Sequence, residues 1–241
     1  MRGAADDPRD GADTRPLTRA FLPPMHLKIC CIATPAEAAR AIGAGASALG
    51  LVSAMPSGPG VIDEATIASI AAVVSPPIET YLLTSEREAT AIAAQHARCR
   101  TTTLQLVDRL ASHDEYQRLR ALVEGVTLVQ VIHVLDESSI DEAVELAPFV
   151  DRLLLDSGNP RLAVKELGGT GRTHDWALSA RIRAATDRPL LLAGGLRVDN
   201  VGEAIATVRP FGIDVCSGVR TDGALDSDKL ARFAHAVFAA A

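Results

Sequence analysis

Residues 190–201 read LLLAGGLRVDNV, an apolar run that ends in two glycines and then in the polar start of a helix. Short apolar runs of this kind alternate with helical stretches about eight times from Leu27 onward. Several runs are apolar throughout, which is typical of parallel strands buried on both faces of a sheet. The predicted strands span residues 27–32, 48–52, 78–83, 102–107, 127–134, 152–155, 189–193 and 213–216.

Helix start signals follow several of these runs. Thr34 precedes a proline and stands three residues before Glu37, which is the pattern of a capping box. Ser112 and Glu115 repeat the pattern. Further helices are predicted over residues 63–74, 138–146, 176–185, 198–208 and 226–239.

Eight β-α units in roughly 215 residues match the count and size of a TIM barrel, the (β/α)8 fold, in a single domain. We expect this barrel to occupy residues 25–241. An open, doubly wound sheet is the alternative, although no Gly-x-Gly-x-x-Gly follows the first predicted strand. Residues 1–24 are polar and rich in proline and glycine, without the apolar core of a secretory signal, and we interpret them as a flexible tail.

Composition limits the classes of partner and the compartment. The chain is 48% hydrophobic and 22% charged, and its net charge of -6 argues against a dedicated nucleic-acid binder. No run reaches the roughly 18 apolar residues that a membrane span needs, so no membrane partner is predicted. Without an export signal we expect a cytoplasmic protein whose four cysteines form no structural disulfide. The sequence does not decide between a monomer and a homodimer.

Turns with glycine and serine follow the seventh and eighth predicted strands. Gly194 and Gly195 lie after one strand, and Ser217 and Gly218 lie after the other. Both turns can expose backbone N–H groups, and the loops at these two places form the common phosphate cradle of TIM barrels. Ordinary turns without a ligand are the alternative.

A third glycine-rich segment, LGGTGRTHDW at residues 167–176, follows the sixth predicted strand. It contains Gly169 and Gly171, together with two threonines that can form hydrogen bonds. We expect it to act as a mobile cover over the substrate.

Reactive side chains also stand at strand ends. Asp156 follows the apolar run of the sixth strand, where it is a helix cap, an ion-pair partner or a catalytic acid. Cys30 and Cys31 end the first strand in LKICCIAT, residues 27–34. Neighbouring strand residues point to opposite faces, so the two cysteines are not expected to share a metal, and no metal site is predicted. A thiol and a carboxyl across one barrel mouth make a usable acid–base pair.

Together these motifs resemble the phosphoribosylanthranilate isomerase family of tryptophan biosynthesis. The family's first strand reads Lys-Ile-Cys-Gly-Ile-Thr, and this chain has KICCIAT at residues 28–34. GASALGLV, LQLVD and LLLDS are similar to the family's second, fourth and sixth strands. GGTGRTHDW, AGGLRVDNV and DVCSGV complete the series in the family's order, so the resemblance covers residues 26–239.

The resemblance implies an Amadori rearrangement of N-(5-phosphoribosyl)anthranilate to 1-(2-carboxyphenylamino)-1-deoxyribulose 5-phosphate. In the family the strand-one cysteine is the general base and the strand-six aspartate the general acid, and these roles fall on Cys30 and Asp156. The implied substrate is a small phosphorylated sugar, and no cofactor is implied. Cys31, one residue out of phase with the base, is expected to pack against a helix.

Three departures from the family pattern affect the predicted substrate pocket. Cys31 replaces a glycine, and Val107-Asp108 replaces the family's His-Gly at the end of the fourth strand. Pro59 stands roughly where the family has an arginine that pairs with the anthranilate carboxylate. A site without that charged, bidentate contact is expected to bind the carboxylate less well.

Arg172, Arg197 or Arg220 could supply the missing positive charge from other loops. Two alternatives to the isomerase therefore stay open. One is an acid–base enzyme that acts on a phosphorylated sugar without the anthranilate carboxylate. The other is a non-catalytic barrel that binds a phosphorylated metabolite.

Overall fold

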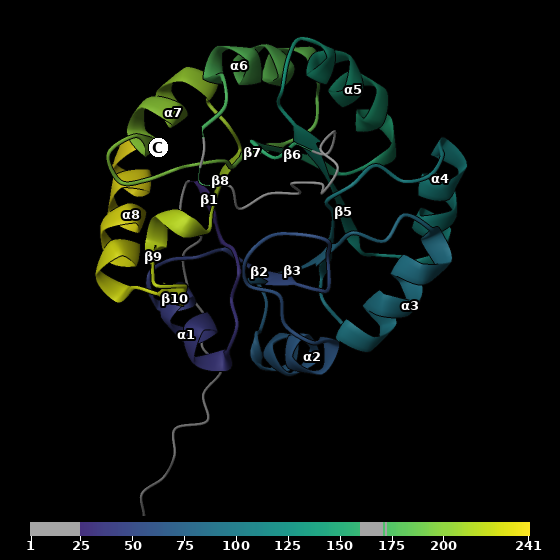
Figure 1. The fold of residues 1–241 in the computed structure, drawn as a ribbon, viewed down its shortest axis with the longest axis horizontal. Helices are drawn as coiled ribbons and strands as arrows, with labels where there is room; N and C mark the ends of the chain where they lie inside the picture. The colour runs from purple at the N-terminus through teal and green to yellow at the C-terminus, as the bar shows by residue number, and fades with distance from the viewer. Residues whose placement is uncertain (1–24, 160–170, 172) are drawn as a thin grey trace, which may run out of the picture.

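The computed structural model describes residues 25–159, 171 and 173–241, and in these ranges the chain forms a closed barrel of eight parallel strands (Figure 1). The order of the strands around the barrel is their order in the sequence, and β1 pairs with β8 with Ile29 opposite Val215. The predicted TIM barrel is confirmed, and this closure excludes the open doubly wound sheet. The predicted tail, residues 1–24, lies outside the described residues.

The strands are short, as expected for a barrel whose helices cover its outer surface. Their bounds are β1 His26–Ile29, β2 Ala48–Val52, β3 Glu79–Thr84, β4 Thr103–Leu106, β5 Thr127–His133, β6 Arg152–Asp156, β7 Leu190–Leu192 and β8 Gly212–Val215. A small hairpin, β9 Arg220–Thr221 with β10 Ala224–Leu225, precedes the last helix.

Helices form the outer ring of Figure 1. Their bounds are α1 Pro35–Gly43, α2 Glu64–Val73, α3 Ala89–Cys99, α4 His113–Leu122, α5 Ser138–Leu146, α6 Trp176–Ala185, α7 Val201–Val208 and α8 Ser227–Ala240. Thr34 caps α1 as predicted, since its hydroxyl accepts from Glu37 N at 3.1 Å. None of the helices in the described ranges is long and apolar enough to cross a membrane.

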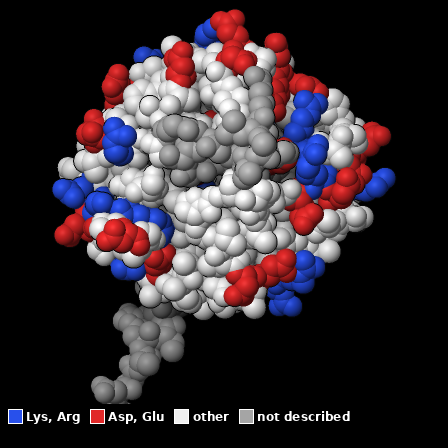
Figure 2. Space-filling view, in the orientation of Figure 1, with Lys and Arg blue, Asp and Glu red and all other residues white. Residues whose placement is uncertain are grey.

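Side chains that alternate along the strands supply two apolar layers. One layer fills the space between the strands and the helices. The other fills the inside of the barrel and consists of Cys30, Cys31, Ala48, Val52, Tyr81, Leu83, Val107, Val129, Val131, Leu154, Leu191 and Ala193. On the face shown in Figure 2, the described charged side chains lie mainly at the periphery.

Two predicted boundaries differ from the structure by three residues, and one predicted capping box does not form. β1 ends at Ile29 instead of residue 32, so both adjacent cysteines belong to the loop that follows the strand. α7 begins at Val201 instead of residue 198, because a hydrogen bond from Arg197 N to Asn200 Oδ1 (2.7 Å) closes a turn before the helix. Ser112 precedes α4 without a capping hydrogen bond to its side chain, because Glu115 N donates to Ser112 O at 3.2 Å, and the Glu115 carboxylate accepts from Ala89 N at 2.6 Å.

Candidate active site

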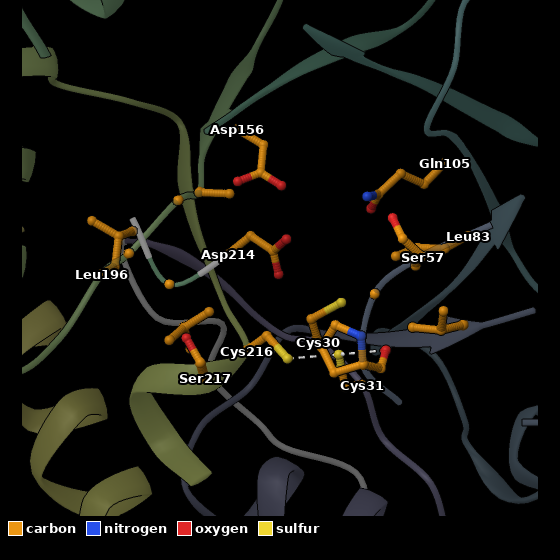
Figure 3. Close-up of a pocket in the computed structure, with 18 of the residues that line it drawn as sticks. Cys30, Cys31, Ser57, Leu83, Gln105, Asp156, Leu196, Asp214, Cys216 and Ser217 are labelled. Atoms are coloured by element: carbon orange, nitrogen blue, oxygen red, sulfur yellow. Dashed lines mark hydrogen bonds between the residues drawn. The ribbon is translucent and has the colours of Figure 1, made fainter. Parts of the chain in front are cut away.

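A pocket opens at the carboxyl ends of the strands, where the catalytic loops of TIM barrels lie. Residues following β1, β2, β7 and β8 line much of it, and Gln105 and Asp156 enter it from β4 and β6 (Figure 3). The pocket contains both predicted reactive residues, Cys30 and Asp156. Because these residues come from opposite parts of the barrel, only closure of the sheet brings them together.

The position of Cys30 is determined by the seam between β1 and β8. Its backbone N–H donates to Val215 O at 2.8 Å, which continues the parallel ladder one residue past the strand. Cys30 is only 6% exposed. A Cβ on Gly50 would lie 2.7 Å from Cys30 Sγ and 3.0 Å from Lys28 Nζ, so the glycine leaves room for both groups. The thiol and the ammonium are therefore close neighbours.

A buried ion pair adjoins the pocket, which is lined by its Asp214 member and not by Lys28. Lys28 Nζ lies 2.9 Å from Asp214 Oδ1 and 5.3 Å from the centre of the Tyr81 ring. Burial alone would lower the pKa of Lys28, but Asp214, Cys30 and Tyr81 together outweigh burial and hold that pKa above its ordinary value. Lys28 is therefore a fixed positive charge beneath the Cys30 thiol.

The surroundings of Cys30 favour its thiolate. A hydrogen bond from the Cys31 thiol lowers the pKa of Cys30, and the Lys28 charge lowers it further. These two effects outweigh burial and the Asp214 charge, which act in the opposite direction. The thiolate is the reactive form of cysteine, so this environment is suited to a base or a nucleophile.

Cys31 does not pack against a helix, and that expectation was wrong. Its φ of +63° turns the chain back, so its side chain lines the same pocket as Cys30. Its sulfur lies 3.6 Å from Pro59 O and 2.6 Å from Cys216 Sγ. The alternation rule failed here because β1 had already ended at Ile29. Within the described ranges, no group of three or more His, Cys, Asp or Glu side chains is arranged to hold a metal ion.

Asp156 is the last residue of β6, and its carboxyl projects into the pocket (Figure 3). It is 8% exposed, and Oδ1 accepts from Ser157 N at 2.7 Å. This hydrogen bond fixes one oxygen, and the carboxyl still faces the pocket. Of the three roles considered from the sequence, the pocket position is the one that a catalytic acid needs.

The predicted phosphate turns lie together on one side of the pocket. Gly194, Gly195, Ser217 and Gly171 line it, and a Cβ on Gly171 would lie 3.7 Å from Ser217 Oγ. Gly194 and Gly195 adopt φ of +83° and +60°, the left-handed region that favours glycine.

Gly218 does not line the pocket but lies where the β7 and β8 turns pack together. It lies in the 3-10 turn Ser217–Val219, where a Cβ would come within 2.1 Å of Leu196 O, so only glycine lets the β7 and β8 turns approach each other. Gly169, the remaining predicted residue, lies outside the described residues.

Neither Arg197 nor Arg220 takes the place of the family's arginine as a partner for the substrate carboxylate. Arg197 is exposed and pairs with Asp199 at 3.1 Å, and Arg220 pairs with Glu37 at 3.3 Å while donating to Cys30 O at 3.1 Å. Arg172, the third predicted candidate, lies outside the described residues. No arginine or lysine is among the described residues that line the pocket. The side chain of Asp108 has its own partners, since Oδ1 accepts from Arg109 N at 2.9 Å and Oδ2 lies 4.0 Å from Arg87 Nε.

Lys28, Asp214 and Gln105 were not singled out from the sequence. The signal for the first two was present, because LKIC and IDVC each place one charge inside an apolar strand. A buried charge needs a partner, and these two strands pair with Lys28 directly opposite Asp214. Gln105 is 4% exposed, and its Oε1 has no hydrogen-bond partner among the described residues. Nothing in the sequence distinguishes this amide from one paired in the core.

Comparison with known proteins identifies relatives over nearly the whole barrel. The sequence profile of the N-(5'-phosphoribosyl)anthranilate (PRA) isomerase family matches residues 27–236. An N-(5'-phosphoribosyl)anthranilate isomerase of Haloferax volcanii is 36% identical over 218 residues, covering 88% of this chain and 92% of that protein. One of Methanosarcina acetivorans is 32% identical over 236 residues, covering 93% of this chain and 96% of that protein.

Solved structures agree with these relatives. Phosphoribosyl anthranilate isomerase from Thermotoga maritima matches with a TM-score of 0.74 at 28% identity, covering 88% of this chain and 98% of the other. A phosphoribosyl anthranilate isomerase in complex with reduced 1-(o-carboxyphenylamino)-1-deoxyribulose 5-phosphate matches with a TM-score of 0.71 at 26% identity, with the same coverage. This chain belongs to the N-(5'-phosphoribosyl)anthranilate isomerase family.

Proposed function

We propose that this chain catalyses its family's isomerisation with Cys30 as general base and Asp156 as general acid. The observation that carries the assignment is that a thiol with a lowered pKa and a strand-end carboxyl enter one pocket. Family membership makes the chain a phosphoribosylanthranilate isomerase, an aldose–ketose isomerase of tryptophan biosynthesis. The relatives favour this activity over a different phosphorylated sugar and over a barrel that only binds.

The proposed reaction consists of proton transfers. Asp156 gives its proton to the furanose ring oxygen as the C1–O bond breaks, and the nitrogen lone pair forms the C1=N iminium. The Cys30 thiolate then removes the proton on C2, and the C–H electrons move to give an enolamine. The enolamine tautomerises to the 2-ketone, which yields 1-(2-carboxyphenylamino)-1-deoxyribulose 5-phosphate. General acid and general base contributions are each typically worth about 10²–10⁴-fold in rate.

The phosphate is proposed to lie against the β7 and β8 turns. Backbone N–H groups near Gly194, Gly195, Ser217 and Gly218 would bind its oxygens, and Gly171 adjoins them. The related structure that holds a phosphorylated product analogue supports a phosphorylated ligand. This placement puts the sugar ring between the turns and the acid–base pair.

The compartment and the assembly are also proposed. A Cys30 thiolate must stay reduced, which supports the cytoplasm because its thiol pools keep cysteines reduced. We propose either a monomer or a homodimer, and a dimeric phosphoribosylanthranilate isomerase of Thermotoga maritima among the similar structures supports the dimer. Light scattering of the purified chain distinguishes the two.

The test measures loss of fluorescence of freshly generated N-(5-phosphoribosyl)anthranilate. Wild type is expected to turn over this substrate, and Cys30→Ser and Asp156→Asn are each expected to lower kcat by about 10²-fold or more. Cys99→Ser is the matched thiol control, because Cys99 is buried at the end of α3, away from the residues that line the pocket. Asp108→Asn is the matched carboxyl control. Full turnover by Cys30→Ser would overturn the assignment of the base.

A further inference from the structure

Two thiols beside the proposed base approach each other across the barrel seam. Cys216 Sγ lies 2.6 Å from Cys31 Sγ, a little beyond the roughly 2.05 Å of a disulfide bond. Both side chains line the pocket, and neither has a role in the proposed proton transfers (Figure 3). All four cysteines are free thiols in this structure.

The backbone holds these sulfurs together. β1 and β8 are paired up to Ile29 and Val215, and the Cys30 N–H extends the pairing to Val215 O at 2.8 Å. Cys216 directly follows β8, and the positive φ of Cys31 turns its side chain toward it. The loop after β2 supports the turn from the other side, since a Cβ on Gly60 would lie 2.5 Å from Cys31 Cβ. The approach thus follows from the sheet, with little freedom left to the side chains.

We propose that Cys31 and Cys216 are a thiol-oxidation site that forms a reversible disulfide and lowers the activity of the pocket. The oxidant is a low-molecular-weight disulfide of the glutathione type. The effect on activity rests on the proposed role of Cys30 as base, whereas formation of the disulfide does not.

The exchange proceeds in two steps, formation of a mixed disulfide and its resolution by the second thiol. Cys216, which is half-buried, is the more accessible thiol, and its thiolate attacks the small disulfide to form a mixed disulfide and release one thiolate. The thiolate released in the first step takes the proton of Cys31. The Cys31 thiolate then attacks the Cys216 sulfur and expels the second thiolate. The two protein thiols lose two electrons, and the small disulfide is reduced to two thiols.

Oxidation would also act on Cys30, because the adjacent Cys31 side chain lines the same pocket. The interaction with the reduced Cys31 thiol contributes most to lowering the pKa of Cys30. A sulfur in a disulfide has no proton to donate, so the pKa of Cys30 rises and less thiolate is present at neutral pH. Activity is expected to fall at neutral pH and to recover in part at higher pH, where Cys30 ionises again.

The test exposes the full chain to oxidised glutathione and then counts free thiols after unfolding in an alkylating agent. Wild type is expected to fall from four thiols to two, with a disulfide that joins the Cys31 and Cys216 peptides. Dithiothreitol is expected to restore both the thiols and the activity. Cys99→Ser serves as the matched control and is expected to form the same disulfide.

Cys31→Ser and Cys216→Ser are each expected to form no such internal bridge, and the rate of each is compared only with its own reduced form. A bridge in either variant, or a wild-type bridge that involves Cys30, overturns the proposal. So does a Cys31–Cys216 bridge that leaves the pH–rate profile unchanged. If no bridge forms but Cys30→Ser still abolishes turnover, only this proposal is refuted. If the bridge forms but turnover does not need Cys30, the catalytic assignment is refuted.

Discussion

The ammonium of Lys28 on β1 lies 2.9 Å from the carboxylate of Asp214, its direct pairing partner on β8, with both residues buried inside the barrel. Removing one member of such a pair leaves the other charge without compensation. The pair adjoins the Cys30 thiol, where its two charges act in opposite directions on the pKa. That opposition provides a direct test of the electrostatics.

Replacing each member of the pair is expected to shift the pKa of Cys30 with opposite sign. Lys28→Met removes the positive charge, so the thiolate is less favoured and the pKa of Cys30 rises. Asp214→Asn removes the negative charge, so the pKa falls. The measurement is the pH dependence of Cys30 alkylation in chains that also carry Cys31→Ser and Cys216→Ser. Shifts of the same sign in both variants would indicate disturbed packing instead of charge.

Gly218→Ala is expected to disrupt the proposed phosphate site. An added Cβ would lie 2.1 Å from Leu196 O, so the β7 and β8 turns must move apart. We expect KM for the phosphorylated substrate to rise by about 10-fold, the effect of roughly one lost hydrogen bond, and inhibition by inorganic phosphate to weaken. Gly202→Ala in α7 is the control, since its Cβ would meet nothing within 4 Å. Unchanged phosphate inhibition in Gly218→Ala would argue for a different phosphate position.

Gln105→Leu is expected to weaken substrate binding without lowering the stability of the fold. Gln105 Oε1 is buried in the pocket without a hydrogen-bond partner among the described residues, so the amide contributes little to the fold of the free protein. If substrate supplies the partner, the variant raises KM by up to about 10-fold and leaves the urea midpoint unchanged or higher. Steady-state kinetics and urea unfolding give the two readouts. A lower midpoint with normal KM would assign the amide to the fold.

Arg220 is expected to stabilise the loop that carries both cysteines. Its guanidinium donates to the carbonyls of Cys30 and Cys31 and pairs with Glu37. Arg220→Met leaves Glu37 without its charged partner and should cost about 3 kcal/mol in the free energy of unfolding. Arg197→Met, which removes an exposed pair with Asp199 and an exposed hydrogen bond to Gly195 O, should cost less than about 1 kcal/mol. Urea titrations of both variants decide the comparison.

Glu37 makes the same network sensitive to acid. Burial alone would raise the pKa of Glu37, but N–H donors from Ala33 and Leu225 and the charge of Arg220 hold it below its ordinary value. The stabilisation is therefore present above the ordinary glutamate pKa of about 4.3 and is lost as pH falls through the lowered folded value. Glu37→Gln is expected to reduce the difference in unfolding free energy between neutral and acid pH. If Glu37→Gln leaves the difference in unfolding free energy between neutral and acid pH unchanged, Glu37 is not the cause of the acid sensitivity.

Local patterns were sufficient to predict the barrel and its reactive strand ends. Apolar runs such as 190–192 repeat with helices between them, and parallel strands so connected have few ways to close. Asp156 was found because it stands where an apolar run stops, and the barrel puts such positions on one face. Cys30 was found near the end of the first run, and the family resemblance selected it over Cys31. The exact helix starts were harder to predict, because side chains such as Asn200 can close a turn just before the helix.

The sequence by itself determined the (β/α)8 architecture and the presence of a cysteine pair and a carboxyl at the mouth, because these depend on periodicity and on position along each strand. The choice of Cys30 over Cys31 as the base came from the family resemblance. Tertiary structure alone decided that Lys28 faces Asp214, that Arg220 is occupied by Glu37, and that Cys31 faces Cys216. The last pair is separated by 185 positions in the chain. Such contacts depend on closure between β1 and β8 and on a single positive φ at Cys31, and neither leaves a local pattern in the sequence.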